Sequence, residues 1–159
     1  MTIRRAEARD AKVLGELGAA LMQTHYAFDR DRFLEPGEGS EAGYARFLAS
    51  RLSDEESIVL VAERDGVIVG YAYAAIEPLS WKDLRDECGW IHDLLVTDEA
   101  RRSGVGEALL NGTLEWLREQ RMPRVMLGTA AQNETARRLF ERRGFRATMI
   151  EMTLELASR

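Results

Sequence analysis

The chain of 159 residues contains one cysteine, three prolines and two histidines. A lone Cys88 excludes an internal disulfide framework and is typical of a reducing compartment, so we expect a cytoplasmic protein. The same scarcity leaves no metal motif, and we expect no metal. No apolar run approaches the roughly 20 residues of a membrane-spanning helix. The segment from Met1 to Glu7 also lacks the apolar core of a secretory signal.

Neither sign of charge is in large excess. The 22 basic and 27 acidic residues give a net charge of −5, which argues against a nucleic-acid partner. Apolar residues make up 45% of the chain and charged residues 31%, a balance typical of a folded domain with a sizeable core. We therefore expect one domain over residues 1–159.

Hydrophobic periodicity and turn residues predict an α/β fold with a mixed sheet. Antiparallel hairpins come first and crossover helices later, which is why the sheet should be mixed. Residues 23–39 should be irregular because Pro36, Gly37 and Gly39 break any helix there. The strands are expected at residues 2–5, 57–63, 67–76, 90–96, 125–128 and 145–156, and the helices at 10–22, 40–52, 104–121 and 133–143. Asp10 and Asn133 should cap the first and last of these helices. Arg64-Asp65-Gly66 should form a hairpin turn, and the apolar stripe of the helix at 40–52 includes Tyr44 and Phe47.

The stretch from Trp90 to Leu117 organises the chain: an apolar strand, a glycine-bearing loop and an amphipathic helix opened by Gly104 and Gly106. The first N–H groups of a helix have no internal partner and carry partial positive charge, which suits a phosphate. Arg101 and Arg102 add full positive charge. Taken alone the two glycines are a weak signal, because the third glycine of a dinucleotide fingerprint and the Gly-Lys-Ser/Thr of a Walker loop are absent.

A second block changes that interpretation. Arg101-x-x-Gly104-x-Gly106 is followed by Asn133-x-x-Ala136-x-x-Leu139-Phe140-x-x-x-Gly144-Phe145, and together the two blocks resemble the GNAT superfamily of N-acetyltransferases over nearly the full chain. The resemblance implies transfer of an acetyl group from acetyl-CoA to a primary amine of a small molecule or a protein. It also implies a mostly antiparallel sheet that splays at the cofactor slot and is flanked by helices.

The resemblance carries cofactor contacts over by position. Backbone N–H groups of residues 102–107 would hold the CoA pyrophosphate, and the backbone of residues 94–96 would pair with the pantetheine arm. Asn133 would contact the pantetheine or the thioester region. Arg137 or Arg138 would reach the 3′-phosphate, although a solvated helix face explains both equally well. The full cofactor set is Leu94, Leu95, Val96, Arg101, Arg102, Ser103, Gly104, Val105, Gly106, Glu107, Asn133 and Arg137.

Acetyl transfer needs an unprotonated amine. An alkyl amine with a pKa of ~10.4 is almost entirely protonated at pH 7, so a base must assist. His92 lies where the resemblance implies a deprotonating residue, often acting through water, and imidazole accepts protons near neutral pH. A polar residue satisfied within the sheet is the alternative. Strand alternation should send Asp93 to the opposite face, where a structural role is favoured, and Glu77 is a further candidate base.

One position departs from the family pattern. Phe140 occupies the place of a tyrosine proposed to protonate the leaving thiolate in many relatives. Expelling a thiolate of pKa ~8.5 unprotonated costs roughly 2 kcal/mol at pH 7, which slows but does not prevent the reaction. We name no general acid, since Tyr26, Tyr71 and Tyr73 have no positional support. The alternatives are a non-catalytic acyl-CoA-binding sensor or partner-binding module, and an unrelated nucleotide-binding α/β protein.

The acceptor amine should be bound by the segments that rim the slot, residues 23–39, 77–89 and the last strand. The two loops combine acidic and aromatic side chains, which would suit a cationic amine; ordinary solvated loops are the alternative. These side chains are Asp29, Asp31, Glu35, Glu38, Glu77, Asp83, Asp86 and Glu87 with Tyr26, Phe28, Phe33 and Trp81. The resemblance also implies that the final strand, residues 148–154, packs across a homodimer.

Overall fold

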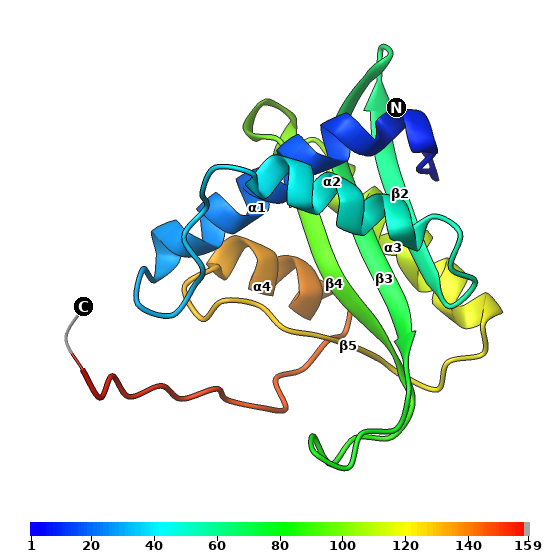
Figure 1. The fold of residues 1–159 in the computed structure, drawn as a ribbon. Helices are drawn as coiled ribbons and strands as arrows, with labels where there is room; N and C mark the ends of the chain where they lie inside the picture. The colour runs from blue at the N-terminus through cyan, green and yellow to red at the C-terminus, as the bar shows by residue number, and fades with distance from the viewer. Residues whose placement is uncertain (158–159) are drawn as a thin grey trace.

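The computed structural model describes residues 1–157 as a five-stranded sheet with helices on both faces (Figure 1). The mixed α/β class expected from the sequence is confirmed. In chain order the elements are β1 (Thr2–Arg5), η1 (Ala8–Asp10), α1 (Ala11–Phe28), α2 (Ser40–Arg51), β2 (Ser57–Arg64), β3 (Val67–Glu77), β4 (Cys88–Val96), η2 (Asp98–Ala100), α3 (Val105–Glu119), β5 (Val125–Leu127) and α4 (Glu134–Arg142).

The strands follow the order β1-β2-β3-β4-β5 across the sheet. The first four are antiparallel, and β5 joins β4 in parallel. The turn between β2 and β3 consists of Asp65 and Gly66, whose φ angles are 52° and 78°. Two left-handed residues form the tight turn whose twist matches a hairpin, and Asp-Gly is a favoured pair there. The predicted hairpin is thus confirmed.

Each face of the sheet carries its own apolar core. On one face α1 and α2 bury Leu14, Leu17 and Leu48 against Val61, Tyr71 and Tyr73. On the other face α3 and α4 bury Leu109, Leu117 and Phe140 against Leu60, Ala72 and Ala74. Consecutive residues of β3 alternate between the two cores because side chains of a strand point alternately to opposite faces.

A β-bulge interrupts the pairing of β3 and β4. Tyr73 lies opposite Asp93 and Ala74 lies opposite Ile91, so His92 is the extra residue on β4. A bulge locally breaks the alternation of side chains. As a result both His92 and Asp93 contact tyrosines on the α1–α2 face, and the expectation that they point to opposite faces is wrong.

Two further expectations about the elements are wrong. Residues 23–28 continue α1 to Phe28 instead of being irregular, because no proline or glycine lies between Gln23 and Glu35 to stop the helix. Residues 145–156 are extended but form no strand, and they leave the sheet toward the C-terminus (Figure 1). Asp10 precedes α1 as expected, but its carboxylate bonds Arg4 and the Glu7 N–H instead of capping α1. Within residues 1–157 no helix is long and apolar enough to cross a membrane.

Candidate active site

The loop between β4 and α3 bends through two left-handed residues. Arg102 has a φ of 58° and Gly104, the N-cap of α3, has a φ of 83°. A Cβ atom added at Gly104 would meet no atom within 4 Å. Glycine is therefore favoured there by its backbone conformation, and the space above the first turn of α3 is open.

The start of α3 offers a row of unpaired donors. The N–H group of Ala108 makes the first helical bond, to the Gly104 carbonyl at 3.0 Å. Among residues 1–157, the N–H groups of residues 102–107 donate to no acceptor, and no side chain caps the helix. Six consecutive donors at the positive end of a helix form an anion-binding geometry. The predicted pyrophosphate site has the required donors.

Side chains of the loop hold its shape. The Ser103 hydroxyl donates to the Ala100 carbonyl at 2.6 Å and accepts from Arg64 at 2.8 Å. Arg101 pairs with Asp98 at 2.8 Å, and Glu107 lies 3.8 Å from Arg143. These contacts fix the backbone, which is the part of the loop that presents the donors.

The sheet splays beside this loop. Along β4 only Gly89, Trp90 and Ile91 pair with β5, so the edge from His92 to Val96 is open on that side. The Thr97 N–H donates to the Val69 carbonyl on the β3 side at 2.9 Å. Because backbone groups of successive strand residues alternate in direction, Val96 and Leu94 direct their N–H and C=O groups into the opening, whereas Leu95 pairs with Tyr71.

The second block of the sequence lies on α4. Asn133 caps this helix as predicted, and its Oδ1 accepts the Ala136 N–H at 3.2 Å. Arg137 is exposed and donates to the Ala131 carbonyl at 3.2 Å, whereas Arg138 pairs with Glu134 at 3.0 Å. Arg137 is therefore turned toward the loop that follows β5, and Arg138 is turned along its own helix.

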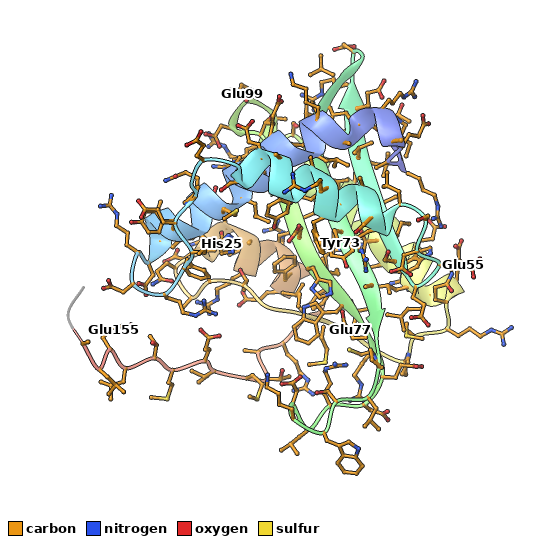
Figure 2. The ribbon with its side chains drawn as sticks, in the orientation of Figure 1. His25, Glu55, Tyr73, Glu77, Glu99 and Glu155 are labelled. Atoms are coloured by element: carbon orange, nitrogen blue, oxygen red, sulfur yellow. The ribbon has the colours of Figure 1, made fainter. Side chains whose placement is uncertain are left out.

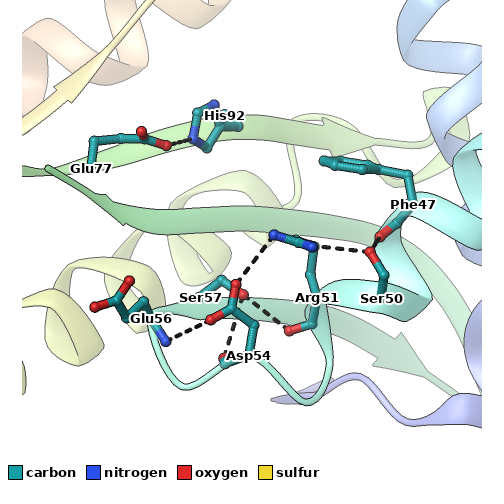
Figure 3. A network of polar contacts seen from close by, with 8 residues as sticks. All are labelled: Phe47, Ser50, Arg51, Asp54, Glu56, Ser57, Glu77 and His92. Carbon is teal, nitrogen blue, oxygen red and sulfur yellow. Dashed lines mark hydrogen bonds and ion pairs between the residues drawn. The ribbon is translucent and has the colours of Figure 1, made fainter. Parts of the chain in front are cut away.

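His92 and Glu77 form a hydrogen-bonded pair at the bulge. The Nε2 atom of His92 lies 2.7 Å from the Oε1 atom of Glu77, and the side chains are 33% and 32% exposed (Figure 3). The two residues come from adjacent strands, β4 and β3. The His92 ring stacks on Tyr73 with centroids 5.1 Å apart and a 20° tilt. Two of the predicted catalytic residues thus lie together at a solvent-accessible point beside the open edge of β4.

Asp93 is buried in a separate network on the same face. Its Oδ2 atom accepts the Tyr71 hydroxyl at 2.9 Å and the Tyr44 hydroxyl at 3.3 Å. Burial raises the pKa of the Asp93 carboxyl, and the two tyrosine bonds oppose the rise. Because the helices cover this carboxyl, its contacts support the structural role that the sequence favoured.

Aromatic contacts lead from His92 toward α2. Tyr73 packs edge-on against Phe47 with centroids 5.5 Å apart, and Figure 2 shows Tyr73 and Glu77 along the same strand. Burial raises the pKa of Tyr73, opposed by Arg51. Beyond Phe47 a hollow of about 550 Å³ opens between α1, α2 and their connection. It is lined by Met22, Leu34, Glu38, Gly39, Ser40, Gly43, Tyr44 and Phe47.

Tyr44 and Phe47 were read from the sequence only as the apolar stripe of α2. Nothing in the sequence of α2 shows that these two residues lie near the site. Strand alternation alone could have shown that Tyr71 and Tyr73 share one face of the sheet.

Two of the tyrosines considered as general acids have other partners. The Tyr71 hydroxyl is bonded to Asp93, and the Tyr26 ring lies near Arg30. Phe140 is buried against Phe145 in the core below α4. Among residues 1–157 no three His, Cys, Asp or Glu side chains are grouped so that they could hold a metal ion.

The chain resembles known proteins both in sequence and in fold. The sequence profile of the acetyltransferase (GNAT) family matches residues 19–145. The uncharacterized N-acetyltransferase YhfO of Bacillus subtilis strain 168 is 30% identical over 147 residues, which cover 91% of this chain and 89% of the relative.

Solved structures share the fold. A mutant of the BH1408 protein from Bacillus halodurans has a TM-score of 0.84 at 21% identity, covering 99% of this chain and 100% of that one. A predicted acetyltransferase from Clostridium acetobutylicum, solved with acetyl-CoA, has a TM-score of 0.73 at 17% identity, covering 98% and 96%. The alternative of an unrelated nucleotide-binding protein is therefore wrong. The chain is an acyltransferase that belongs to the acetyltransferase (GNAT) family.

Proposed function

We propose that this acyltransferase is an N-acetyltransferase that transfers the acetyl group of acetyl-CoA to a primary amine of a small molecule or a protein. One observation carries the proposal: the unpaired donors at the start of α3 and the open edge of β4 lead directly to the His92–Glu77 pair. A phosphate-rich carrier bound at the first two features would place its thioester near the third. The acetyl-CoA held by the Clostridium acetobutylicum structural neighbour agrees with this carrier.

We assign contacts to three parts of acetyl-CoA: the pyrophosphate, the pantetheine arm and the 3′-phosphate. The N–H groups of residues 102–107 would hold the pyrophosphate, and Leu94 and Val96 would pair with the amides of the pantetheine arm. Asn133 caps α4 through its Oδ1, which leaves its side-chain amide nitrogen to contact the pantetheine. Arg137 is the side chain we assign to the 3′-phosphate, since its guanidinium already lies beside Ala131.

The proposed chemistry needs a proton acceptor near the thioester. The amine nitrogen attacks the thioester carbonyl carbon, the C–S bond breaks, and the amine loses one proton. When Nε2 of His92 carries the hydrogen, it donates a hydrogen bond to the Glu77 carboxylate. The Nδ1 atom then remains free of hydrogen and takes the amine proton directly or through water. Glu77 thus orients the ring and stabilises the imidazolium that forms. Asp93 takes no proton in this scheme because it is bonded to Tyr71 and Tyr44.

The leaving thiolate lacks a tyrosine donor at the family position. Phe140 is buried in the core, and a phenyl ring donates no proton. The thiolate therefore leaves unprotonated or takes a proton from water, at a cost of roughly 2 kcal/mol at pH 7. This cost lowers the rate without removing the reaction.

We place the acceptor amine on the α1–α2 side of the sheet. Phe47 lines the hollow and packs against Tyr73, and the Tyr73 ring in turn stacks on His92, so the hollow lies on the same side of the sheet as the proposed base. Its lining is mostly apolar with one carboxylate, Glu38, which would suit an amine with an apolar body and a cationic group. Tyr26 and Phe33 already lie near Arg30 and Arg32, so we no longer assign these two rings to the acceptor.

We also propose a cytoplasmic location for the protein. This proposal rests on the single Cys88 alone.

Single-turnover release of the CoA thiol with a panel of amines tests the function. We expect the enzyme preloaded with acetyl-CoA to release thiol in step with acetylation of at least one cationic amine. The alternative, an acyl-CoA sensor without turnover, is favoured only by Phe140. It would be supported by tight acetyl-CoA binding with no thiol release above hydrolysis across the whole panel, a result that would overturn the enzymatic proposal.

A further inference from the structure

His25 is one of only two histidines in the chain, and the chemistry proposed above uses the other, His92. It is half-buried in the last turn of α1. Leu21, one turn earlier, packs on the cluster of the sheet that includes Tyr73, and Met22 lines the hollow in which we place the acceptor. Residues three and four apart on a helix share a face. His25 therefore lies at the corner of α1 between the hollow and the sheet.

The C-terminal half of α1 extends toward the open edge of β4. α1 packs on β3 and β4, and Figure 1 shows its C-terminal half continuing past β4 to the side on which α4 lies. On that side no strand pairs with β4 from His92 to Val96 among residues 1–157. In Figure 2, His25 lies between the C-terminal half of α1 and α4. His25 thus belongs to the part of α1 on the side of the slot in which we place the thioester.

Both histidines act on the buried Asp93 carboxylate. Burial raises the pKa of Asp93, and the bonds from Tyr71 and Tyr44 and the charges of His92 and His25 oppose that rise. The interaction between two charges weakens as their distance grows. An imidazole from α1 and an imidazole from β4 therefore lie near the same point on this face of the sheet.

The hydrogen bond of His25 determines which ring nitrogen is free. Its Nδ1 atom lies 2.9 Å from the Leu21 carbonyl oxygen. A carbonyl oxygen only accepts, so Nδ1 carries the hydrogen and the neutral ring keeps an unprotonated Nε2. Among residues 1–157 no group bonds this Nε2 atom. Phe28 and Phe33 pack edge-on against the ring with centroids 6.2 and 5.0 Å away, so a fixed ring presents a free hydrogen-bond acceptor.

We propose that Nε2 of His25 accepts a hydrogen bond from the attacking amine and makes His25 a specificity-determining residue for primary amines, a role that rests on the acetyl transfer proposed above. A neutral primary amine has two N–H groups. Its lone pair bonds to the thioester carbon, one hydrogen leaves to His92 or to water, and the C–S bond breaks. The other N–H donates to His25 throughout and directs the lone pair at the thioester. A secondary amine has a single N–H group and cannot supply both.

Two substitutions separate the free nitrogen from the bond that holds the ring. The amide of His25→Asn reaches about as far as Nδ1 and can keep the bond to Leu21, whereas the amide of His25→Gln reaches about as far as Nε2. We compare them with the fastest amine of a panel built around phenethylamine, which has an apolar body and one cationic group. His25→Asn should lower kcat/KM for this amine by roughly tenfold, and His25→Gln should recover most of that loss. Calorimetry should give both variants the wild-type affinity for acetyl-CoA.

The N-methyl derivative of the same amine gives a readout that a purely structural role would not change, because a ratio of two kcat/KM values does not depend on the fraction of active enzyme. Wild type should prefer the primary amine, and His25→Asn should reduce that preference by roughly tenfold. An active wild type with the same ratio as His25→Asn would overturn the role of His25 and leave the proposed function intact. A wild type that releases no thiol with any amine would overturn the proposed function and, with it, the role of His25.

Bromoacetyl-CoA tests the position of residue 25 without turnover. In His25→Cys the new thiolate should displace bromide from the bound reagent, which joins the sulfur to the CH₂ group of the acyl chain. Gln23→Cys is the matched control, because residue 23 is more exposed but lies on the opposite side of α1. Peptide mass mapping should show faster modification at position 25 than at position 23, protection by acetyl-CoA, and an unmodified, buried Cys88. Faster modification at position 23, or no protected modification at position 25, would place residue 25 away from the acyl group and overturn the proposal.

Discussion

The Tyr71 hydroxyl donates to the Asp93 carboxylate at 2.9 Å inside the interface between the sheet and α2. Tyr44 adds a second bond from α2 at 3.3 Å. Among residues 1–157, no lysine or arginine pairs with this carboxylate; neutral hydroxyls are its hydrogen-bond partners. Burial raises the pKa of Asp93 despite these bonds, because an unpaired charge is poorly solvated there.

Asp93→Asn should change how stability depends on pH. The folded protein binds the Asp93 proton more tightly than the unfolded chain does, so this group favours folding at acid pH. Its contribution is lost as the pH rises from roughly 4 through the raised folded pKa. The asparagine variant lacks this dependence. Its free energy of unfolding relative to wild type should therefore increase with pH over that range, by about 1.4 kcal/mol for each unit of pKa shift.

Urea unfolding of both proteins at several pH values measures this effect. Burying the asparagine amide can lower the free energy of unfolding by an amount that does not depend on pH. Such a cost shifts the difference between the variant and wild type but does not change how that difference varies with pH. Parallel curves between acid and neutral pH would show that Asp93 titrates alike in the folded and unfolded states.

Asp10 should behave in the opposite way. Arg4 donates to its carboxylate at 2.7 Å and the Glu7 N–H at 2.8 Å. These bonds, Arg4 first, lower the pKa of Asp10 against the effect of burial. The stabilisation is present above the unfolded pKa of roughly 4 and is lost as the pH falls through the folded value. Asp10→Asn should cost about 1–3 kcal/mol at neutral pH, and thermal melts should converge with wild type in acid. A cost that stays constant into acid would contradict the assigned pairing.

His92→Ala should lower kcat/KM by roughly 10²–10⁴-fold, the usual contribution of a general base, and should flatten the pH–rate profile near neutrality. Glu77→Gln keeps the size of the side chain but removes the carboxylate that holds the ring at 2.7 Å. It should lower the rate less than His92→Ala and shift the acid limb of the same profile. Acetyl-CoA affinity, measured by calorimetry, should be unchanged in both variants. An unaltered pH–rate profile in His92→Ala would remove this residue as the base.

Structural features that are set by residues close together in the sequence could be predicted, whereas features that depend on pairing between strands could not. The turn at Gly104 before α3 could be predicted because the glycine and the helix after it encode their conformation locally. The cap at Asn133 and the Asp65–Gly66 turn were predicted for the same reason. The bulge at His92 could not be predicted, since it depends on how β3 and β4 pair across the sheet. Simple alternation therefore sent His92 and Asp93 to opposite faces, whereas the bulge brings both to the α1–α2 face.

The two other wrong expectations also concern interactions beyond the local sequence. Residues 23–28 were expected to be irregular because Pro36, Gly37 and Gly39 follow them, but they continue α1 to Phe28, and His25 packs there against Phe28 and Phe33. Residues 145–156 have a strand pattern but no strand partner among residues 1–157. A period-two pattern states that a segment suits a sheet, but it does not state which sheet edge receives it.

Gly104→Glu should abolish acetyl-CoA binding. Gly104 has a φ of 83° and open space around its missing Cβ, so the fold tolerates a side chain apart from the strained backbone conformation. A glutamate there would place a negative charge beside the unpaired donors that are proposed to bind pyrophosphate. Calorimetric titration with acetyl-CoA should show at least a hundredfold loss of affinity, or roughly 2.7 kcal/mol.

Gly39→Glu is the matched control for this substitution. Gly39 is also the N-cap of a helix, has a φ of 89° and has no atom within 4 Å of an added Cβ. The two variants therefore carry the same left-handed strain and the same new charge, but Gly39 lies at the start of α2 near the proposed acceptor hollow. With cofactor affinity as the only readout, Gly39→Glu should bind acetyl-CoA like wild type. Equal losses in both variants would assign the effect to strain or net charge, and retained affinity in Gly104→Glu would remove the pyrophosphate from the start of α3.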